Sequence, residues 1–231
     1  MAQPTRLPAL LLLLSAPLLS WTLLAPPAWA APVGTVLGRV EFSEELRSLF
    51  PRRDPATLYL PTPTVILPSL EEAVVYLERV PGTFAPSLKN AVSHVRGREF
   101  HPRVLTLVKG TRMVFANDDP YEHLLKSNAL LNPPISFPLK PGGPLCVTRT
   151  TTPEEFVVSC PQHMRSECFI LVLQNPFFTT PVKDANYLLK NVPAGRYLLK
   201  AWHPDLVPVS QEITVAAGKQ TPVDLIFVKA R

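Results

Sequence analysis

Short apolar runs separated by turn residues are the main pattern along the chain. The runs are rich in Val, Leu, Ile, Phe and Tyr, and the breaks between them contain Gly, Pro, Asn or Asp. Runs of this length with turns between them are typical of the strands of a β-sandwich. We therefore expect strands at residues 35–42, 72–80, 104–108, 112–116, 156–159, 168–173, 196–202, 211–215 and 223–228.

Three further segments do not follow the strand pattern. Residues 43–50 fit a capped helical turn, and residues 87–95 place Leu88, Val92 and Val95 at helical spacing. Residues 51–68 are proline-rich and predict an extended loop or insertion. The chain has 28 prolines among its 231 residues, which argues against long helices.

The N-terminal residues 1–30 have the composition of a secretory signal peptide. One basic residue, Arg6, precedes the mostly apolar residues 7–24, and an Ala-Trp-Ala sequence ends at Ala30. We expect cleavage after Ala30 and a periplasmic or secreted protein. An uncleaved membrane anchor is the alternative, because the apolar run approaches spanning length. After cleavage we expect no membrane span.

The charge of the chain changes this picture only a little. Cleavage removes one arginine and lowers the formal charge from +5 to +4. A mildly basic chain lacks the dense positive charge of a nucleic-acid-binding protein. Such a charge usually indicates a mixed, solvated surface, and steering of an acidic partner is the alternative. The length is sufficient for one large core or two small ones. We therefore expect no nucleic acid among the partners.

The candidate chemistry lies in two segments that are far apart in the sequence. SCPQHMRSECFILV, residues 159–172, places Cys160 and His163 at the end of one expected strand and just before another. Upstream, residues 100–127 read as a strand, a turn, a second strand and a polar exit that leads to His123. Two imidazoles and one thiolate in a trigonal arrangement are what a mononuclear blue-copper site requires.

This ordered set resembles the cupredoxin family, over residues 99–174. The shared pattern is F-x-P, a strand, Gly-Thr, a strand ending F-x-N-D, then His followed by Ser, and later C-x-x-H before a strand. It is most similar to exported plastocyanin-like or methylamine-utilisation-like proteins. The resemblance implies a Greek-key sandwich and one copper ion held by His123, Cys160 and His163, with Asn117 supporting the first ligand. It also implies electron transfer with a redox partner protein. We expect no enzyme activity, because the sequence shows neither the trinuclear histidine set of a multicopper oxidase nor a Ser/His/Asp or paired-carboxylate arrangement.

The fourth ligand departs from the family pattern. Relatives with a short loop carry a methionine three residues after the second histidine, and this position is Ser166 here. Met164 is adjacent to His163, and neighbours in an extended segment point in different directions. Met164, Glu167 and a site without an axial ligand are therefore the open alternatives.

The cysteine count bears on the same question. In an oxidising compartment, three cysteines leave one thiol unpaired. A disulfide between Cys146 and Cys168 would leave Cys160 for a metal, whereas a bridge that includes Cys160 would abolish the site. Two other functions stay open at this point: a metal-free β-sandwich that binds a partner at the cell surface, and a copper carrier.

A second resemblance lies near the C-terminus. DANYLLKNVPAGRYLLKAWHP, residues 184–204, is similar to carboxypeptidase-regulatory-like, transthyretin-like β-sandwiches. The opening strands of that family match residues 38–40 and 73–77, which precede the cupredoxin-like segment. We predict an all-β chain in which a cupredoxin-like domain, residues 97–174, is inserted into an immunoglobulin/transthyretin-like sandwich split between residues 33–96 and 175–231. A tandem arrangement is the alternative.

Overall fold

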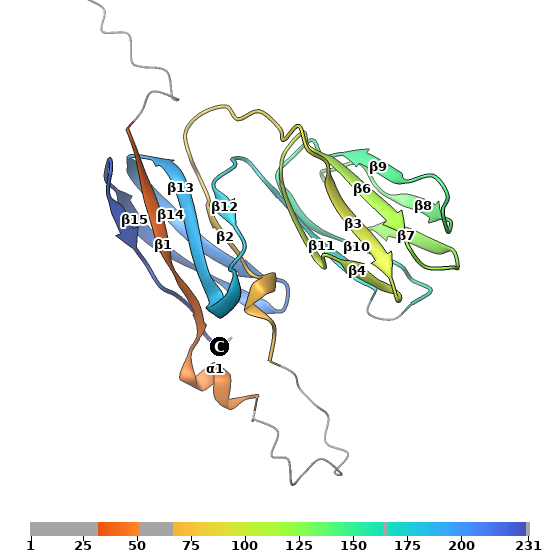
Figure 1. Cartoon of the computed structure of the whole chain (residues 1–231), viewed down its shortest axis with the longest axis horizontal. Helices are drawn as coiled ribbons and strands as arrows, with labels where there is room; N and C mark the ends of the chain where they lie inside the picture. The colour runs from red at the N-terminus through yellow and green to blue at the C-terminus, as the bar shows by residue number, and fades with distance from the viewer. Residues whose placement is uncertain (1–31, 51–66, 164–165, 230–231) are drawn as a thin grey trace, which may run out of the picture.

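The chain forms an all-β structure whose sheets fall into two groups, which lie left and right in Figure 1. The computed structural model describes residues 32–50, 67–163 and 166–229. The predicted fold class is confirmed, because sheets dominate both groups. Every helix within the described ranges is too short and too polar to cross a bilayer.

The first sandwich, on the left of Figure 1, combines strands from both ends of the described chain. Its strands are β1 (Val33–Phe42), β2 (Val74–Leu77), β12 (Phe178–Thr179), β13 (Asn186–Pro193), β14 (Gly195–His203), β15 (Leu206–Val215), β16 (Gln220–Pro222) and β17 (Leu225–Phe227). One sheet has β1 between β13 and β16, with β17 also pairing with β1; the other has the order β12-β2-β14-β15. Early and late strands therefore pair directly with each other.

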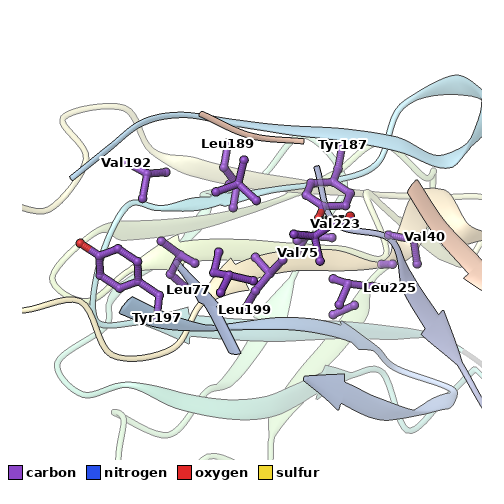
Figure 2. Packing of buried hydrophobic residues seen from close by; sticks show 14 of the residues in the cluster. Val40, Val75, Leu77, Tyr187, Leu189, Val192, Tyr197, Leu199, Val223 and Leu225 are labelled. Atoms are coloured by element: carbon purple, nitrogen blue, oxygen red, sulfur yellow. Dashed lines mark hydrogen bonds between the residues drawn. The ribbon is translucent and has the colours of Figure 1, made fainter. Parts of the chain in front are cut away.

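The core of this sandwich follows from the alternation of its strands. Figure 2 shows the side chains of Val40, Val75, Leu199 and their neighbours filling the space between the two sheets. The buried Tyr187 hydroxyl donates a hydrogen bond to the Val223 carbonyl at 2.5 Å, so its polar end is satisfied. Loss of any of these buried apolar side chains would leave a cavity in this core.

Short helices lie beside the first sandwich. They are α1 (Glu44–Ser48), η3 (Leu70–Glu72) and η4 (Lys183–Ala185). The Ser43 side chain caps α1 by accepting a hydrogen bond from the Leu46 backbone at 3.1 Å, and Leu46 is buried in the core. The predicted helical turn at residues 43–50 is therefore confirmed. Most of the proline-rich segment predicted at residues 51–68 lies outside the described residues.

The second sandwich, on the right of Figure 1, has its own apolar core. Its strands are β3 (Ala91–Arg96), β4 (Glu99–His101), β5 (Val104–Val108), β6 (Arg112–Asn117), β7 (His123–Ser127), β8 (Ser136–Leu139), β9 (Cys146–Arg149), β10 (Glu154–Ser159) and β11 (Glu167–Leu173). One sheet has the order β4-β3-β6-β9 and the other has the order β5-β11-β10-β7-β8. The β10–β11 hairpin aligns Ser159 with Glu167, which fixes the two ends of the loop between them.

One expectation about secondary structure is wrong. The helix suggested at residues 87–95 is instead strand β3, which pairs with β4 and with β6. Ser93 is fully buried in this strand, and its hydroxyl donates to the Pro102 carbonyl at 3.0 Å. The polar residue at an inward position conceals the strand alternation in the sequence. β3 precedes residue 97 and yet belongs to the second sandwich.

The two sandwiches meet at a small apolar cluster bordered by ion pairs. Val74 and Trp202 of the first sandwich pack with Leu171 and Leu173 of β11. Beside them, the Arg103 guanidinium donates to Glu72 at 2.5 Å and, through two nitrogens, to Asp205 at 3.0 and 3.1 Å. Charged hydrogen bonds of this forked kind are directional and fix orientation. Arg103 therefore connects the second sandwich to two segments of the first.

We expect Arg103→Gln to lower the free energy of unfolding by about 1 kcal/mol, because a partly buried, forked ion pair is lost. Urea denaturation followed by tryptophan fluorescence measures this change, since Trp202 lies at the junction. Arg39→Gln is the matched control: its exposed pair with Glu41 is 3.5 Å long, so we expect a change within about 0.5 kcal/mol. Equal losses at the two positions would contradict a specific role for Arg103.

Candidate metal centre

Cys160, His123 and His163 converge at one end of the second sandwich. His123 is the first residue of β7, Cys160 directly follows β10, and His163 lies in the loop that leads to β11. Nδ1 of His123 lies 3.1 Å from Nδ1 of His163, which lies 3.4 Å from Sγ of Cys160. One donor atom from each residue falls within 4.8 Å of the other two. The structure thus brings together the three residues that the sequence predicts as ligands.

The hydrogen bonds of Asn117 shape the chain segment that ends at His123. The Asn117 side-chain amide donates to the carbonyls of Tyr121 and Leu139, at 2.7 and 2.8 Å. Its oxygen accepts a hydrogen bond from the Asp119 backbone at 2.9 Å. The amide therefore closes the loop between β6 and β7 and ties it to β8, where Leu139 is the partner of His123. Asn117 acts on the backbone that positions the ligand.

Asp119 orients the His123 ring. The His123 side chain is fully buried, and its Nε2 lies 3.0 Å from Oδ2 of Asp119. The same carboxylate accepts backbone hydrogen bonds from Gly97 at 2.6 Å and Arg98 at 2.9 Å. Because an ionised carboxylate only accepts, Nε2 carries the ring proton and Nδ1 keeps its lone pair toward His163. His123 is thus held in the tautomer that a metal ligand needs.

The ionisation of Asp119 follows from the same contacts. Burial alone would raise the pKa of this carboxyl group, but the hydrogen bonds from Arg98, Gly97 and His123 outweigh it and hold the pKa below its ordinary value. Gly97 and Arg98 have φ values of +62° and +69°, which form a tight turn between β3 and β4. Neither Asp119 nor this turn stands out in the sequence, because the contact joins segments that are more than twenty residues apart.

The loop that carries Cys160 and His163 is closed by its own backbone. Cys160 donates to the Ser166 carbonyl at 3.0 Å, His163 donates to Cys160 at 3.0 Å, and Ser166 donates to His163 at 3.3 Å. These bonds continue the β10–β11 hairpin to its tip. His163 is partly exposed, and its burial, together with the positive charge of Arg98, lowers its pKa. A neutral imidazole with a free Nδ1 is the form that binds a metal.

An aromatic residue covers both histidines. The Tyr121 ring centroid lies 5.2 Å from that of His123 and 5.7 Å from that of His163. Arg98 donates from Nε to the Tyr121 hydroxyl at 3.3 Å, and its guanidinium carbon lies 5.5 Å from the ring centroid. Tyr121 and Arg98 therefore hold the imidazoles from one side. Sequence reasoning missed both residues.

The fourth-ligand candidates from the sequence have different outcomes. Ser166 is buried, and its hydroxyl has no hydrogen-bond partner. Glu167 is exposed and lines a hollow with Glu72 and His101, near the junction of the two sandwiches. Met164 lies outside the described residues. The described residues therefore place a short, buried hydroxyl at position 166, and the choice among the predicted alternatives stays a prediction.

The three cysteines are free thiols, so the predicted option of a Cys146–Cys168 disulfide is not formed. Both residues are buried in the core of the second sandwich. Burial raises the pKa of Cys146 to about 11 and that of Cys168 to about 12, because an apolar core disfavours the thiolate. These two thiols are core residues, and Cys160 alone lies beside histidine nitrogens.

The donor set fits a copper ion. Two nitrogens, or a nitrogen and a sulfur, bound tetrahedrally to one metal lie about 3.3–3.6 Å apart, from metal–ligand distances of about 2.0–2.3 Å. The observed separations of 3.1 and 3.4 Å match this range to within a few tenths of an ångström. Imidazole and thiolate ligands together suit copper or zinc rather than calcium or magnesium.

A second cluster of metal-binding residue types lacks a histidine nitrogen that is available to a metal. Among the described residues, Glu72, His203 and Asp205 also lie close together. Nε2 of His203 lies 3.0 Å from the Ser69 carbonyl, and Nδ1 accepts from the Asp205 backbone at 3.0 Å. Both ring nitrogens are therefore used by the backbone, and burial lowers the pKa of this histidine. His203 is a structural residue of the first sandwich.

The solved structures that are similar to part of the chain include several copper proteins. A copper-containing nitrite reductase from Thermus scotoductus is 23% identical over 42% of this chain, with a TM-score of 0.35. A purple cupredoxin from Nitrosopumilus maritimus is 20% identical over 36% of this chain and 99% of its own length, with a TM-score of 0.32. An oxidised mutant of amicyanin is 13% identical over 36% of this chain and 81% of its own, with a TM-score of 0.33.

This chain spans only a quarter of the length of the nitrite reductase. No protein-family model matches the sequence, and no curated protein matches it either.

We expect Asp119→Asn to disturb the His123 ring, because an amide offers one acceptor oxygen where the carboxylate accepts three hydrogen bonds. In the unmodified, metal-free protein, long-range ¹H–¹⁵N spectra should show His123 with its proton on Nε2. In the variant this single tautomer should be lost, together with about 1–3 kcal/mol of stability for the unpaired donor.

Asp118→Asn is the matched control, since Asp118 pairs with His94 and Arg96 at the surface. Its His123 signals should be unchanged. A proton on Nδ1 of His123 in the unmodified protein would contradict the role of Asp119.

Proposed function

We propose that this chain is an exported copper protein that transfers single electrons through a site formed by His123, Cys160 and His163. The observation that carries the proposal is the convergence of two Nδ1 atoms and one Sγ atom at the end of a sandwich. A bound copper ion would supply a one-electron couple between Cu(I) and Cu(II). The protein's part is to hold the three donors in place.

The surroundings of the donors favour electron transfer. His123 is fixed by Asp119, and the loop with Cys160 and His163 is closed by its backbone hydrogen bonds. Because these supports are hydrogen-bonded to the donors or to their backbone, the donors need to move little when the charge of the site changes. A site that keeps one geometry in both charge states exchanges electrons with little reorganisation.

His163 offers the contact with a partner. It is partly exposed, whereas His123 is fully buried and Cys160 is almost fully buried. We therefore propose that a redox partner protein approaches the His163 edge of the site. Export belongs to the same proposal and rests on residues 1–30, which lie outside the described part of the chain. The insertion of the cupredoxin-like domain into the first sandwich is also part of this proposal. The pairing of β1 with β13 and of β2 with β14 supports it.

We expect the purified, metal-free protein to take up one equivalent of Cu(II) and to develop an intense thiolate-to-copper band in the visible spectrum. Cys160→Ser should abolish this band completely, because the hydroxyl does not replace a thiolate as a copper ligand. Optical titration combined with metal analysis measures both effects.

Cys146→Ala is the matched control, because Cys146 is a buried thiol of the core. This variant should keep the band. A correctly folded protein that stays colourless and takes up no copper would contradict the proposal and support a metal-free binding module. Tight binding of Cu(I) without reversible voltammetry would indicate a copper carrier instead.

A further inference from the structure

The second sandwich has an end that lies away from the candidate metal centre. Strand β3 ends at Arg96, and the turn after it donates hydrogen bonds to Asp119 beside the site. The start of β3 therefore marks the opposite end, and Figure 1 shows the segment after β2 passing over to it. Because β6 runs parallel to β3, it begins at this end too. The segments that meet here, which we call the distal loops, are residues 87–90, 109–112, 128–134 and 149–154.

Hydrogen bonds join the four distal loops to one another. The Ser87 backbone donates to Oγ1 of Thr111 at 3.0 Å, which links the first segment to the second. The Thr150 backbone donates to the Thr111 carbonyl at 3.2 Å, and the Asn132 side chain donates to the Thr152 carbonyl at 2.9 Å. The distal loops therefore form one continuous surface rather than four separate tips.

The carboxylate of Glu154 fixes the loop between β7 and β8. Its oxygens accept backbone hydrogen bonds from Leu130 at 2.6 Å, Leu131 at 3.0 Å and Asn132 at 2.9 Å. Burial alone would raise the pKa of Glu154, but these hydrogen bonds and one from the Asn132 side chain hold the pKa below its ordinary value. The backbone of the two leucines is thus held in place, whereas their side chains are 89% and 61% exposed.

The distal loops combine exposed apolar side chains with basic ones. Leu88 is fully exposed in the segment before β3, so that leucines stand out from two of the four loops. The one acidic residue of these segments is Glu154, whose charge is taken up by backbone N–H groups. The basic residues of the distal loops are Lys89, Lys109, Arg112 and Arg149.

This combination fits the surface of an anionic membrane. Binding at a membrane interface increases with the apolar area that is buried and with the electrostatic attraction to anionic lipids. The exposed leucines supply apolar area, and the four basic residues supply the attraction. The leucines stand on separate loops and line no groove between them, so they suit a soft lipid interface better than the shaped surface of a protein partner.

We propose that the distal loops bind an anionic lipid bilayer, with Leu88, Leu130 and Leu131 at the boundary between headgroups and acyl chains. The basic residues would contact the lipid phosphates. This binding goes beyond the proposed function and does not depend on copper, because none of these residues belongs to the candidate metal centre. Since β3 separates the two ends of the sandwich, the His163 edge would face away from the bilayer and stay open to a redox partner.

The test measures binding to two kinds of vesicle: phosphatidylcholine alone, and phosphatidylcholine mixed with phosphatidylglycerol. It uses the mature chain from Ala31, which contains every strand and helix of both sandwiches and lacks the apolar residues 7–24. We expect sedimentation with the mixed vesicles only, and weaker binding as the salt concentration rises. Phosphatidylcholine supplies the same acyl chains without net charge, so it isolates the contribution of the basic residues.

The double variant of Leu130→Ser and Leu131→Ser should bind the mixed vesicles about tenfold more weakly, because apolar area is removed. Lys89→Gln should weaken this binding by about fivefold, the effect of one basic residue at an anionic surface. Urea denaturation should give unchanged midpoints, since the three substituted side chains are exposed.

Leu188→Ser and Lys190→Gln are the matched controls, because both residues are exposed on β13 of the first sandwich. These two variants should bind as the unmodified chain does. Leu130→Trp adds a direct measurement of insertion: its fluorescence emission should shift to shorter wavelength with the mixed vesicles. Attraction to the headgroups without insertion would leave this emission unchanged and contradict the placement of the leucines.

Two further results would overturn the inference. One is an unmodified chain that does not bind the mixed vesicles; the other is binding that the distal-loop variants leave unchanged. A soluble protein that binds the unmodified chain and not these variants, in the absence of vesicle binding, would assign the surface to protein recognition instead. Copper titration of the same variants should match that of the unmodified chain, so this failure is distinguishable from failure of the proposed function.

Discussion

The buried carboxylate of Asp119 is the contact on which the arrangement of the site depends. A buried charge is costly unless hydrogen bonds compensate it, and Asp119 receives three. Two come from the turn between β3 and β4, and the third comes from the His123 ring. The carboxylate thus joins one sheet of the sandwich to His123 on the other sheet. Without this carboxylate, no hydrogen bond to Nε2 would fix which nitrogen of the buried His123 ring carries the proton.

Strand β11 connects this site to the rest of the chain. It begins directly after the loop with Cys160 and His163, and its side chains alternate between two environments. Cys168 and Ile170 enter the core of the second sandwich, whereas Leu171 and Leu173 pack at the junction with the first. Arg103 adds directional ion pairs at the same junction. The first sandwich therefore packs against β11, the strand that follows the loop with Cys160 and His163.

The sequence predicts the strands well where one face of a strand is uniformly apolar. All nine expected runs are strands, because burial on one side leaves a readable alternation. Strand β3 was not predicted, because the polar residue Ser93 occupies a buried position and interrupts the apolar alternation. The three candidate ligands were predicted from an ordered motif that resembles a known family, in which Cys160 and His163 are close in sequence and His123 is not. The groups that support these residues were not predictable, because Asp119 and Gly97 lie more than twenty residues apart in the sequence and meet only in the folded chain.

The loop of residues 160–166 is the tip of a hairpin whose strands are already in register at Ser159 and Glu167. The backbone pairing of β10 with β11 and the core of the second sandwich hold the two strands together. The hairpin therefore does not depend on which residues form its tip. The chemistry of the candidate site can then change in evolution through a few loop positions, while both cores stay as they are. The same separation makes this loop a unit that protein engineers can exchange as a whole.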